Sequence, residues 1–249
     1  MNTLLFAISY FTRIPVPKWV YATETPVDKA IRYLPLIGIL VGSFGALILY
    51  FCQMLMSYEM AILLSMVATI IITGAFHEDG WADTCDGFGG GGNKNQVLTI
   101  MKDSRIGTYG TIGLIMVLLV KFQLLIAVTP GKIYFSLIAA HALSRMLPVL
   151  MAYTSQYAGV EDQSKSKFLA HKINWIDVAI AAVFALLPFY FLSWSKFFLS
   201  ILLLALVFLG MRWFSHRRIG GFTGDVLGAM QQVAEIVIYI SVVYIQDNY

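Results

Sequence analysis

Long stretches of this chain contain no Asp, Glu, Lys or Arg. The longest extends from Leu34 to Tyr58, and a transmembrane helix needs about 20 consecutive, mainly apolar residues. Other uncharged stretches are Met60 to Phe76, Ile106 to Val120, Val178 to Ser195 and Phe197 to Met211. Two more apolar stretches with few charges are Ile133 to Tyr153 and Val226 to Gln246. We therefore predict an all-α polytopic membrane protein, a bundle of about seven transmembrane helices.

The composition agrees with this prediction. Hydrophobic residues make up 59% of the chain and charged residues 12%, with a mean hydropathy of +0.76. Soluble domains have roughly 45–50% apolar and 25% charged residues. No polar connection is long enough for a core of its own, so we expect residues 1–249 to form a single integral membrane domain. The short segment Met1 to Arg13 is expected to be an interfacial or re-entrant helix, stopped by Pro15 and Pro17.

Positive residues gather on one side of the predicted bundle. With seven spans, 14 of the 17 Lys and Arg residues fall in the N-terminal segment or in the connections on its side. The side richer in Lys and Arg is normally cytoplasmic. The polar motifs of the chain lie on this side, so we expect a protein of the plasma (inner) membrane whose active site faces the cytoplasm.

An acidic motif follows the second apolar stretch and contains Glu78, Asp79, Asp83 and Asp86. In a helix the three aspartates at i, i+4 and i+7 share one face. Like charges at this spacing repel one another, so a cation must compensate them. Carboxylate oxygens are hard ligands, which suit magnesium or manganese.

Two further motifs lie between the acidic motif and the third apolar stretch. The glycine run from Gly89 to Gly92 can adopt positive φ and approach a phosphate closely, although a flexible linker has the same composition. Lys102 and Arg105 lie where the next helix begins and could hold an anion near its positive end. The alternative is that both cations anchor the helix at the lipid headgroups.

The last apolar stretch carries a polar stripe. Asp225, Gly228 and Gln232 lie at i, i+3 and i+7, and Glu235 extends the stripe into the membrane. A buried acid is costly in lipid, so Glu235 should face a partner or a water-filled cavity. A structural hydrogen bond to another helix is the alternative. We expect His141 and Arg145, at i and i+4, to pair with a helix-end carboxylate rather than to bind phosphate.

Together these motifs predict phosphate chemistry. Clustered carboxylates with a divalent ion, and several cations on one face, can hold and activate a phosphoanhydride. No serine or cysteine nucleophile with a nearby base is evident. We therefore expect a substrate hydroxyl to attack phosphorus directly, with a carboxylate or His77 accepting its proton.

The same motifs carry a resemblance to a known family. Four blocks resemble cobalamin synthases, also called adenosylcobinamide-GDP ribazoletransferases: Phe11 to Pro17, Gly74 to Gly87, Met101 to Gly110 and Gly220 to Ala229. The resemblance implies a membrane transferase that joins adenosylcobinamide-GDP to α-ribazole or α-ribazole 5′-phosphate. GMP would be released and adenosylcobalamin or its 5′-phosphate formed, in the last steps of cobalamin synthesis. Magnesium is the implied cofactor.

On this hypothesis the polar residues divide into three roles. Metal ligands are expected among Glu78, Asp79, Asp83, Asp86 and Asp225. Catalytic residues are expected among His77, Asp83, Lys102 and Arg105. Substrate contacts are expected from Gly89, Gly90, Arg217, Arg218, Thr223, Gln232 and Glu235. The expected partners are these small-molecule substrates and membrane lipid, without nucleic acid; self-association and association with other cobalamin-pathway enzymes stay open.

Three other functions compete with this one. CDP-alcohol phosphotransferases also use membrane carboxylates and a hydroxyl nucleophile, but the chain lacks their Asp-Gly-x-x-Ala-Arg block, because Ala82 precedes Asp83. A divalent-cation transporter would need acidic residues along the whole path, whereas the carboxylates here crowd one face. A purely structural membrane protein would leave the polar clusters unexplained.

Overall fold

The computed structural model describes residues 2–21, 27–159, 173–188 and 194–245. Within these ranges the chain is helical, and its bridge between Tyr157 and Phe222 belongs to no strand. The predicted all-α fold class is therefore confirmed. In chain order the helices are α1 (Asn2–Phe11), η1 (Lys18–Tyr21), η2 (Val27–Tyr33), α2 (Leu34–Cys52), α3 (Tyr58–Thr73), α4 (Phe76–Gly90), α5 (Lys94–Met101), α6 (Thr108–Ala127), α7 (Ile133–Ser144), α8 (Met146–Thr154), α9 (Trp175–Leu186), α10 (Trp194–Ile219) and α11 (Gly224–Tyr244).

The described ranges contain five helical segments that are long and apolar enough to cross a membrane. They are Lys29–Cys52, Thr108–Ala127, Ile133–Thr154, Ser195–Ile219 and Gly224–Tyr244. The pair α3 and α4, bent by 87°, makes a sixth if it is counted as one broken span. The predicted number of seven is thus approximate. It included Val178 to Ser195, where α9 has only 12 residues and residues 189–193 lie outside the described ranges.

The bend between α3 and α4 has a local backbone cause. Gly74 ends α3 with φ 66°, and Ala75 follows with φ 58°. Both values lie in the left-handed region, which glycine adopts at helix ends without a steric cost. Two such residues in succession redirect the chain, so that the acidic motif forms a helix of its own instead of continuing α3.

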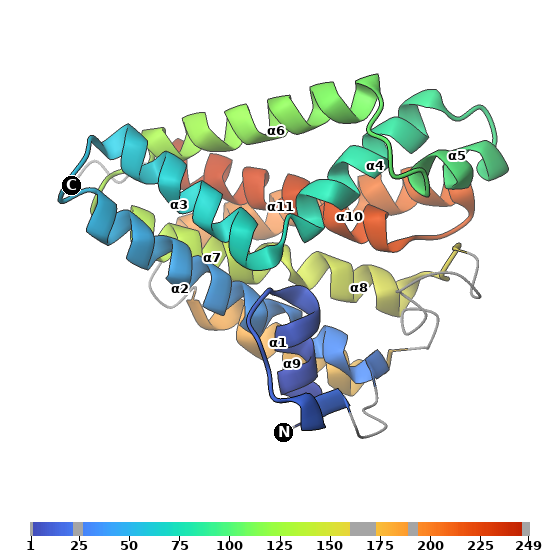
Figure 1. Ribbon diagram of the computed structural model, residues 1–249, viewed down its shortest axis with the longest axis horizontal. Coiled ribbons are helices and arrows are strands. Elements are labelled where there is room, and N and C mark those ends of the chain that lie inside the picture. Colours follow the sequence, from blue (N-terminus) through green and yellow to red (C-terminus); the bar gives the residue numbers. More distant parts are fainter. Residues whose placement is uncertain (1, 22–26, 160–172, 189–193, 246–249) are drawn as a thin grey trace.

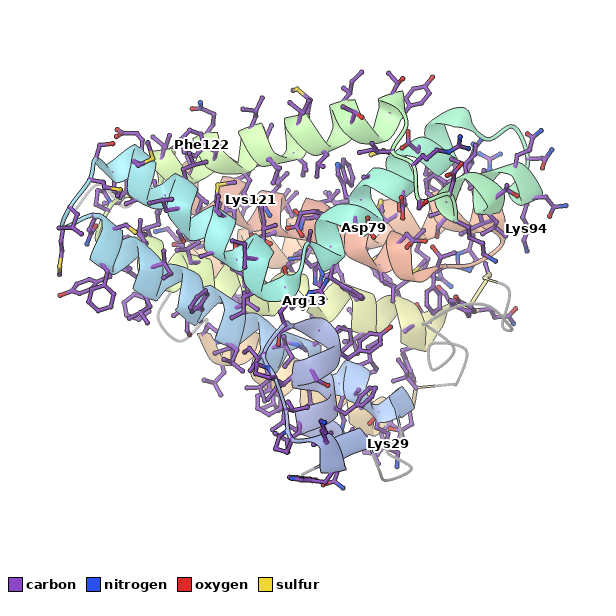
Figure 2. The ribbon with its side chains drawn as sticks, in the orientation of Figure 1. Arg13, Lys29, Asp79, Lys94, Lys121 and Phe122 are labelled. Carbon is purple, nitrogen blue, oxygen red and sulfur yellow. The ribbon has the colours of Figure 1, made fainter. Side chains whose placement is uncertain are left out.

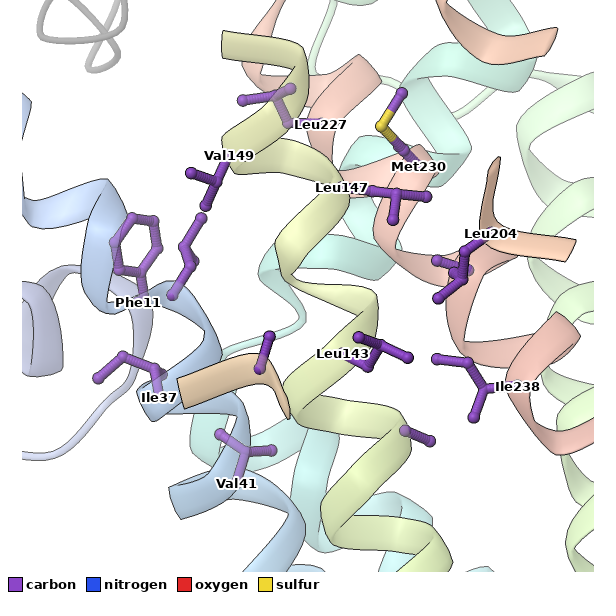
Figure 3. Packing of buried hydrophobic residues seen from close by; sticks show 14 of the residues in the cluster. Phe11, Ile37, Val41, Leu143, Leu147, Val149, Leu204, Leu227, Met230 and Ile238 are labelled. Atoms are coloured by element: carbon purple, nitrogen blue, oxygen red, sulfur yellow. The ribbon is translucent and has the colours of Figure 1, made fainter. Parts of the chain in front are cut away.

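The core lies around α7 and α8. Figure 3 shows their side chains, such as Leu143 and Leu147, between α2 and α11. A close contact of α2 with α7 depends on Gly38, where a Cβ atom would lie 2.1 Å from the carbonyl oxygen of His141. Small residues at helix contacts are typical of membrane bundles.

The outer helices present apolar side chains to the surroundings. Only 11% of the most apolar window of α10 and 22% of that of α6 are buried, against 78% for Ile133–Thr154. Exposed side chains of α10 include Leu202, Leu206 and Leu209. A soluble protein rarely exposes so large an apolar surface, which agrees with a membrane protein. Figure 1 shows α6 along one edge and α1 with α9 at the opposite side.

Candidate active site

The contact between α4 and α11 brings three carboxylates together. Asp79 and Asp83 lie one turn apart on α4, and Asp225 lies in the first turn of α11. Gly80 lies at this contact. A Cβ atom on Gly80 would lie 2.8 Å from the backbone oxygen of Asp225, so glycine allows α4 and α11 to touch. Asp83 is half-buried and within electrostatic reach of Asp79, Asp225 and Asp86. The structure thus places Asp225 beside the predicted acidic face.

Thr223 orients Asp225. Its hydroxyl accepts a hydrogen bond from the backbone N–H of Val226 at 3.3 Å, which caps α11, and lies 3.3 Å from Oδ2 of Asp225, to which it donates. Caps of this kind stabilise a helix by about 1 kcal/mol. Thr223, predicted as a substrate contact, therefore fixes the start of α11 and the direction of the carboxylate.

Asp86 has a structural role that the sequence did not indicate. Its carboxylate oxygens accept hydrogen bonds from the backbone N–H groups of Gly107 at 2.7 Å and Gly110 at 2.8 Å. These groups lie at the start of α6, where backbone donors have no partner within the helix. Asp86, which was predicted as a metal ligand, thus caps the N-terminal end of α6.

Glu78 also lies apart from the three carboxylates. It is buried, and its Oε1 accepts a hydrogen bond from Nε2 of Gln232 at 3.0 Å. The Oε1 atom of Gln232 in turn accepts from Nζ of Lys121 at 2.8 Å. The other carboxylate oxygen of Glu78 has no hydrogen-bond partner within the described ranges. Glu78 therefore belongs to a buried polar network that joins α4, α6 and α11.

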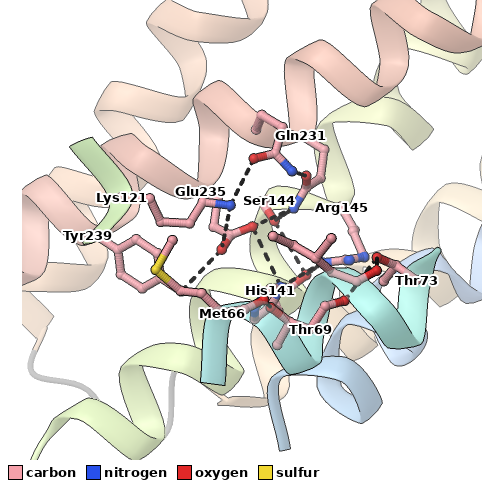
Figure 4. A network of polar contacts seen from close by, with 12 residues as sticks. Met66, Thr69, Thr73, Lys121, His141, Ser144, Arg145, Gln231, Glu235 and Tyr239 are labelled. Atoms are coloured by element: carbon pink, nitrogen blue, oxygen red, sulfur yellow. Dashed lines mark hydrogen bonds and ion pairs between the residues drawn. The ribbon is translucent and has the colours of Figure 1, made fainter. Parts of the chain in front are cut away.

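Glu235 is the centre of this network (Figure 4). Its side chain is 1% exposed and accepts hydrogen bonds from Gln231 at 2.7 Å and Tyr239 at 3.2 Å. Nζ of Lys121 lies 3.3 Å from Oε1, and Nδ1 of His141 lies 3.6 Å from Oε2. The buried acid thus has partners on three helices, as the cost of burying a charge requires.

Arg145 also belongs to this network. Its hydrogen-bond partner is His141 and not the predicted helix-end carboxylate. Its Nη1 donates to the backbone oxygen of His141 at 2.8 Å and lies 3.1 Å from the Nδ1 atom of that histidine. Gln232 and Glu235, predicted as substrate contacts, are held in the same buried network. Both residues therefore contribute to the contacts between helices of the bundle. Neither lines the cavity that is described next.

A cavity of about 870 Å³ is lined by Asp225, whereas Asp79 and Asp83 are not among its lining residues. Its walls come from the end of α1 and the segment after it, the α3–α4 bend, α5 and the start of α11. The charged residues on its walls are Arg13, Lys102 and Asp225, with Thr73 and Thr223 among the polar ones. A volume of this size is typical of small-molecule sites.

The two predicted catalytic cations have different positions. Lys102 is exposed and lines the cavity. Arg105 does not: its Nη2 lies 2.7 Å from Oδ2 of Asp103 at the surface. The hydrogen bonds and the charge of Arg105 lower the pKa of Asp103 to about 2. Because this carboxyl stays ionised at neutral pH, Arg105 is engaged by an anion of the chain itself.

The arginines before α11 contact other parts of the chain. The guanidinium of Arg217 lies 4.9 Å from the ring centre of Trp213. Arg218 donates to the backbone oxygens of Phe88, at 2.8 Å, and of Gly91. Arg218 thereby holds the C-terminal end of α4, where unpaired carbonyl groups attract cations.

Two of the four glycines in the run are helical, which corrects the expectation of a phosphate-binding loop or flexible linker over its whole length. Gly89 and Gly90 form the last turn of α4, and only Gly91 and Gly92 follow it. A Cβ atom on Gly89 would lie 2.6 Å from the ring of Tyr109. Packing of α4 against α6 therefore explains Gly89, and neither glycine lines the large cavity.

His77 is buried within the bundle. It is 5% exposed, its Nδ1 has no hydrogen-bond partner within the described residues, and its ring contacts that of Phe76 edge to face. It does not line the large cavity. The structure therefore places the predicted base inside the bundle and not on the wall of that cavity.

The described residues contain no group of three or more His, Cys, Asp or Glu side chains arranged to hold a metal ion. Magnesium, however, rarely uses a cage made by protein alone. It is usually bound by one or two carboxylates together with substrate phosphates and water. The half-buried oxygens of Asp83 and Asp225, with Asp79 beside them, fit that mode of binding by their chemistry.

Known proteins are similar to this chain over almost its entire length. The model of the cobalamin-5-phosphate synthase family matches residues 3–243. The adenosylcobinamide-GDP ribazoletransferase of Shewanella frigidimarina is 42% identical over 243 residues, 96% of this chain and 93% of that protein. The protein of that name from Shewanella piezotolerans is 40% identical over 243 residues, 96% of this chain and 94% of its own. The chain belongs to the cobalamin-5-phosphate synthase family. No solved structure matches it.

The family match confirms the family that the sequence motifs indicated. The chain is an enzyme, a transferase of cobalamin synthesis, and it lies in a membrane. The match sets it apart from CDP-alcohol phosphotransferases and from cation transporters.

Sequence reasoning missed two residues of this enzyme. Arg13 lines the cavity although its surroundings showed no decisive local pattern. Lys121, a lone cation within an apolar stretch, is the partner of Glu235. A charge inside a transmembrane segment normally has a partner of opposite charge, and that rule links Lys121 to Glu235 from the sequence alone.

We expect Gly80→Ala to lower turnover about tenfold, since small displacements of a catalytic group are costly. The added Cβ would lie 2.8 Å from a backbone atom of Asp225, so α11 must shift and carry its carboxylate away. The matched control is Gly210→Ala on α10, where a Cβ meets no atom within 4 Å. Turnover of both variants in lipid gives the comparison, and equal rates would show that the α4–α11 spacing is unimportant for catalysis.

Proposed function

We propose that the enzyme joins adenosylcobinamide-GDP to α-ribazole or α-ribazole 5′-phosphate. The observation that carries this proposal is the family match over residues 3–243, supported by the names of the Shewanella relatives. A free ribose hydroxyl of the ribazole, which is not the 5′ group because that position carries the phosphate in α-ribazole 5′-phosphate, loses its proton as its oxygen forms a bond to the cobinamide-side phosphorus. The bond from that phosphorus to the GMP oxygen breaks, which gives GMP and adenosylcobalamin or its 5′-phosphate.

We assign this reaction to the cavity that Asp225 lines, with Asp83 within electrostatic reach of Asp225. Asp79, Asp83 and Asp225 would hold magnesium, which would neutralise charge on the diphosphate. Lys102, which also lines the cavity, would compensate the remaining phosphate charge. The proton of the attacking hydroxyl would pass to a carboxylate of this group rather than to His77, because His77 is buried away from the cavity.

We also propose that the cavity opens to the cytoplasm from the inner membrane. The support is the excess of Lys and Arg in the connections on that side. Contact with lipid is consistent with the exposed apolar side chains of α6 and α10. Self-association and association with other enzymes of the pathway stay predictions.

The test is turnover by the purified enzyme in lipid with adenosylcobinamide-GDP and α-ribazole, with magnesium or with a chelator. We expect GMP and the corrinoid product in equal amounts with magnesium, and a loss of both with the chelator that added magnesium restores. Chromatography of both products gives the measurement. No product from folded enzyme would refute the proposed reaction, whereas full activity in the chelator would refute the metal alone.

A further inference from the structure

Arg13 is held at the edge of the cavity by the α3–α4 bend. Its backbone N–H donates to the carbonyl oxygen of Ile72 at 2.7 Å. Its side chain lies over Gly74, where a Cβ atom would be 2.2 Å from Nε. Figure 2 shows Arg13 at the end of α1, between that helix and the start of α4. The left-handed glycine therefore provides the space that the guanidinium occupies.

Aromatic contacts fix the position of α1 and thus of Arg13. The ring of Phe76, at the start of α4, lies 5.8 Å from that of Phe11 and 6.0 Å from that of Tyr10, both edge to face. Such pairs contribute about 0.5–1.5 kcal/mol beyond their buried area. Thr12 accepts a hydrogen bond from the N–H of Ile14 at 3.2 Å. The backbone on both sides of Arg13 is therefore well anchored.

The side chain of Arg13, in contrast, is exposed and has no ion pair or hydrogen bond within the described part of the chain. The charged lining of the cavity consists of Arg13, Lys102 and one acid, Asp225. The described lining residues thus carry a net positive charge, since Asp79 and Asp83 are not among them. An arginine fork binds two oxygen atoms of a phosphate at once, which a lysine cannot do.

We propose that Arg13 binds the diphosphate of the nucleotide substrate, an inference that rests on the proposed function. Arg13 does so from the α1 side of the cavity, together with Lys102 on the α5 side. The N-terminal helix is then part of the active site and not only an interfacial anchor. A phosphate of a lipid headgroup has the same chemistry, so the experiment must separate these two sources.

The experiment measures binding of guanosine diphosphate to the purified enzyme in phosphatidylcholine nanodiscs without added magnesium. We expect Arg13→Ala to weaken binding about tenfold, as loss of a charge-assisted hydrogen bond does, and Arg13→Lys to weaken it less. The matched control is Lys18→Ala, which removes an exposed cation outside the cavity from the same segment. Equal binding by wild type and Arg13→Ala would overturn the proposal, as would wild type that does not bind.

Two further measurements distinguish failure of the proposed role of Arg13 from failure of the proposed function. Wild-type turnover tests the proposed function by itself, so unchanged binding in Arg13→Ala with an active wild type refutes the role of Arg13 alone. Repetition in nanodiscs with anionic lipid tests the headgroup. If Arg13 binds lipid phosphate instead, the variant will differ from wild type only in anionic discs, and the proposal fails. An unchanged melting temperature shows that the variant is folded.

Discussion

Asp83→Asn is expected to lower kcat about a hundredfold without unfolding the enzyme, as loss of a charge that stabilises a transition state does. Asp83 is half-buried beside Asp79, Asp86 and Asp225, and its side chain makes no hydrogen bond within the described residues. The neutral amide has the same shape and relieves like-charge repulsion. Thermal stability should therefore stay equal or rise while turnover in lipid falls.

Two other carboxylates provide controls for Asp83→Asn. Glu59→Gln removes an exposed charge from the opposite end of α3 and should leave turnover unchanged. Asp86→Asn should lower the melting temperature, because an amide nitrogen cannot accept the N–H of Gly107 or Gly110. Near wild-type turnover by Asp83→Asn would contradict its assignment as a metal ligand. Loss of folding in that variant would assign it a structural role like that of Asp86.

Much of the fold could be predicted from local pattern, because a membrane limits the chain to helices that satisfy their own backbone groups. Uncharged runs therefore located α2, α6 and α10, and a run with few charges located α11. The bend at Gly74 could not be predicted in the same way. A glycine within an apolar run fits a straight helix or a helix end, and its φ value depends on the packing of α1 and α4.

The candidate site could be predicted only where its geometry is local. The spacing of Asp79 and Asp83 places them on one face of a helix, and the structure agrees. The roles of Asp86 and Arg13 depend on partners from distant segments, the start of α6 and the α3–α4 bend. A single sequence contains no periodic signal for such contacts, because helix packing decides them.

Glu235→Leu is expected to destabilise the bundle by about 3–5 kcal/mol, the cost of leaving a buried charge without its partner. In the described network Glu235 and Glu78 balance the positive charges of Lys121 and Arg145. Removal of Glu235 leaves one positive charge in excess among apolar helices. The free energy of unfolding, measured with SDS in mixed micelles, should show the loss.

The double variant Lys121→Met, Glu235→Leu distinguishes charge balance from simple loss of packing. It restores neutrality, since Glu78 and Arg145 again balance, and apolar replacement of a whole buried pair is often neutral in stability. We therefore expect it to be more stable than Glu235→Leu alone, and equal or lower stability would refute the charge-balance argument. Ser241→Ala is the uncharged control on the same helix: it removes the bond to Ser200 between α10 and α11 and should cost about 0.6 kcal/mol.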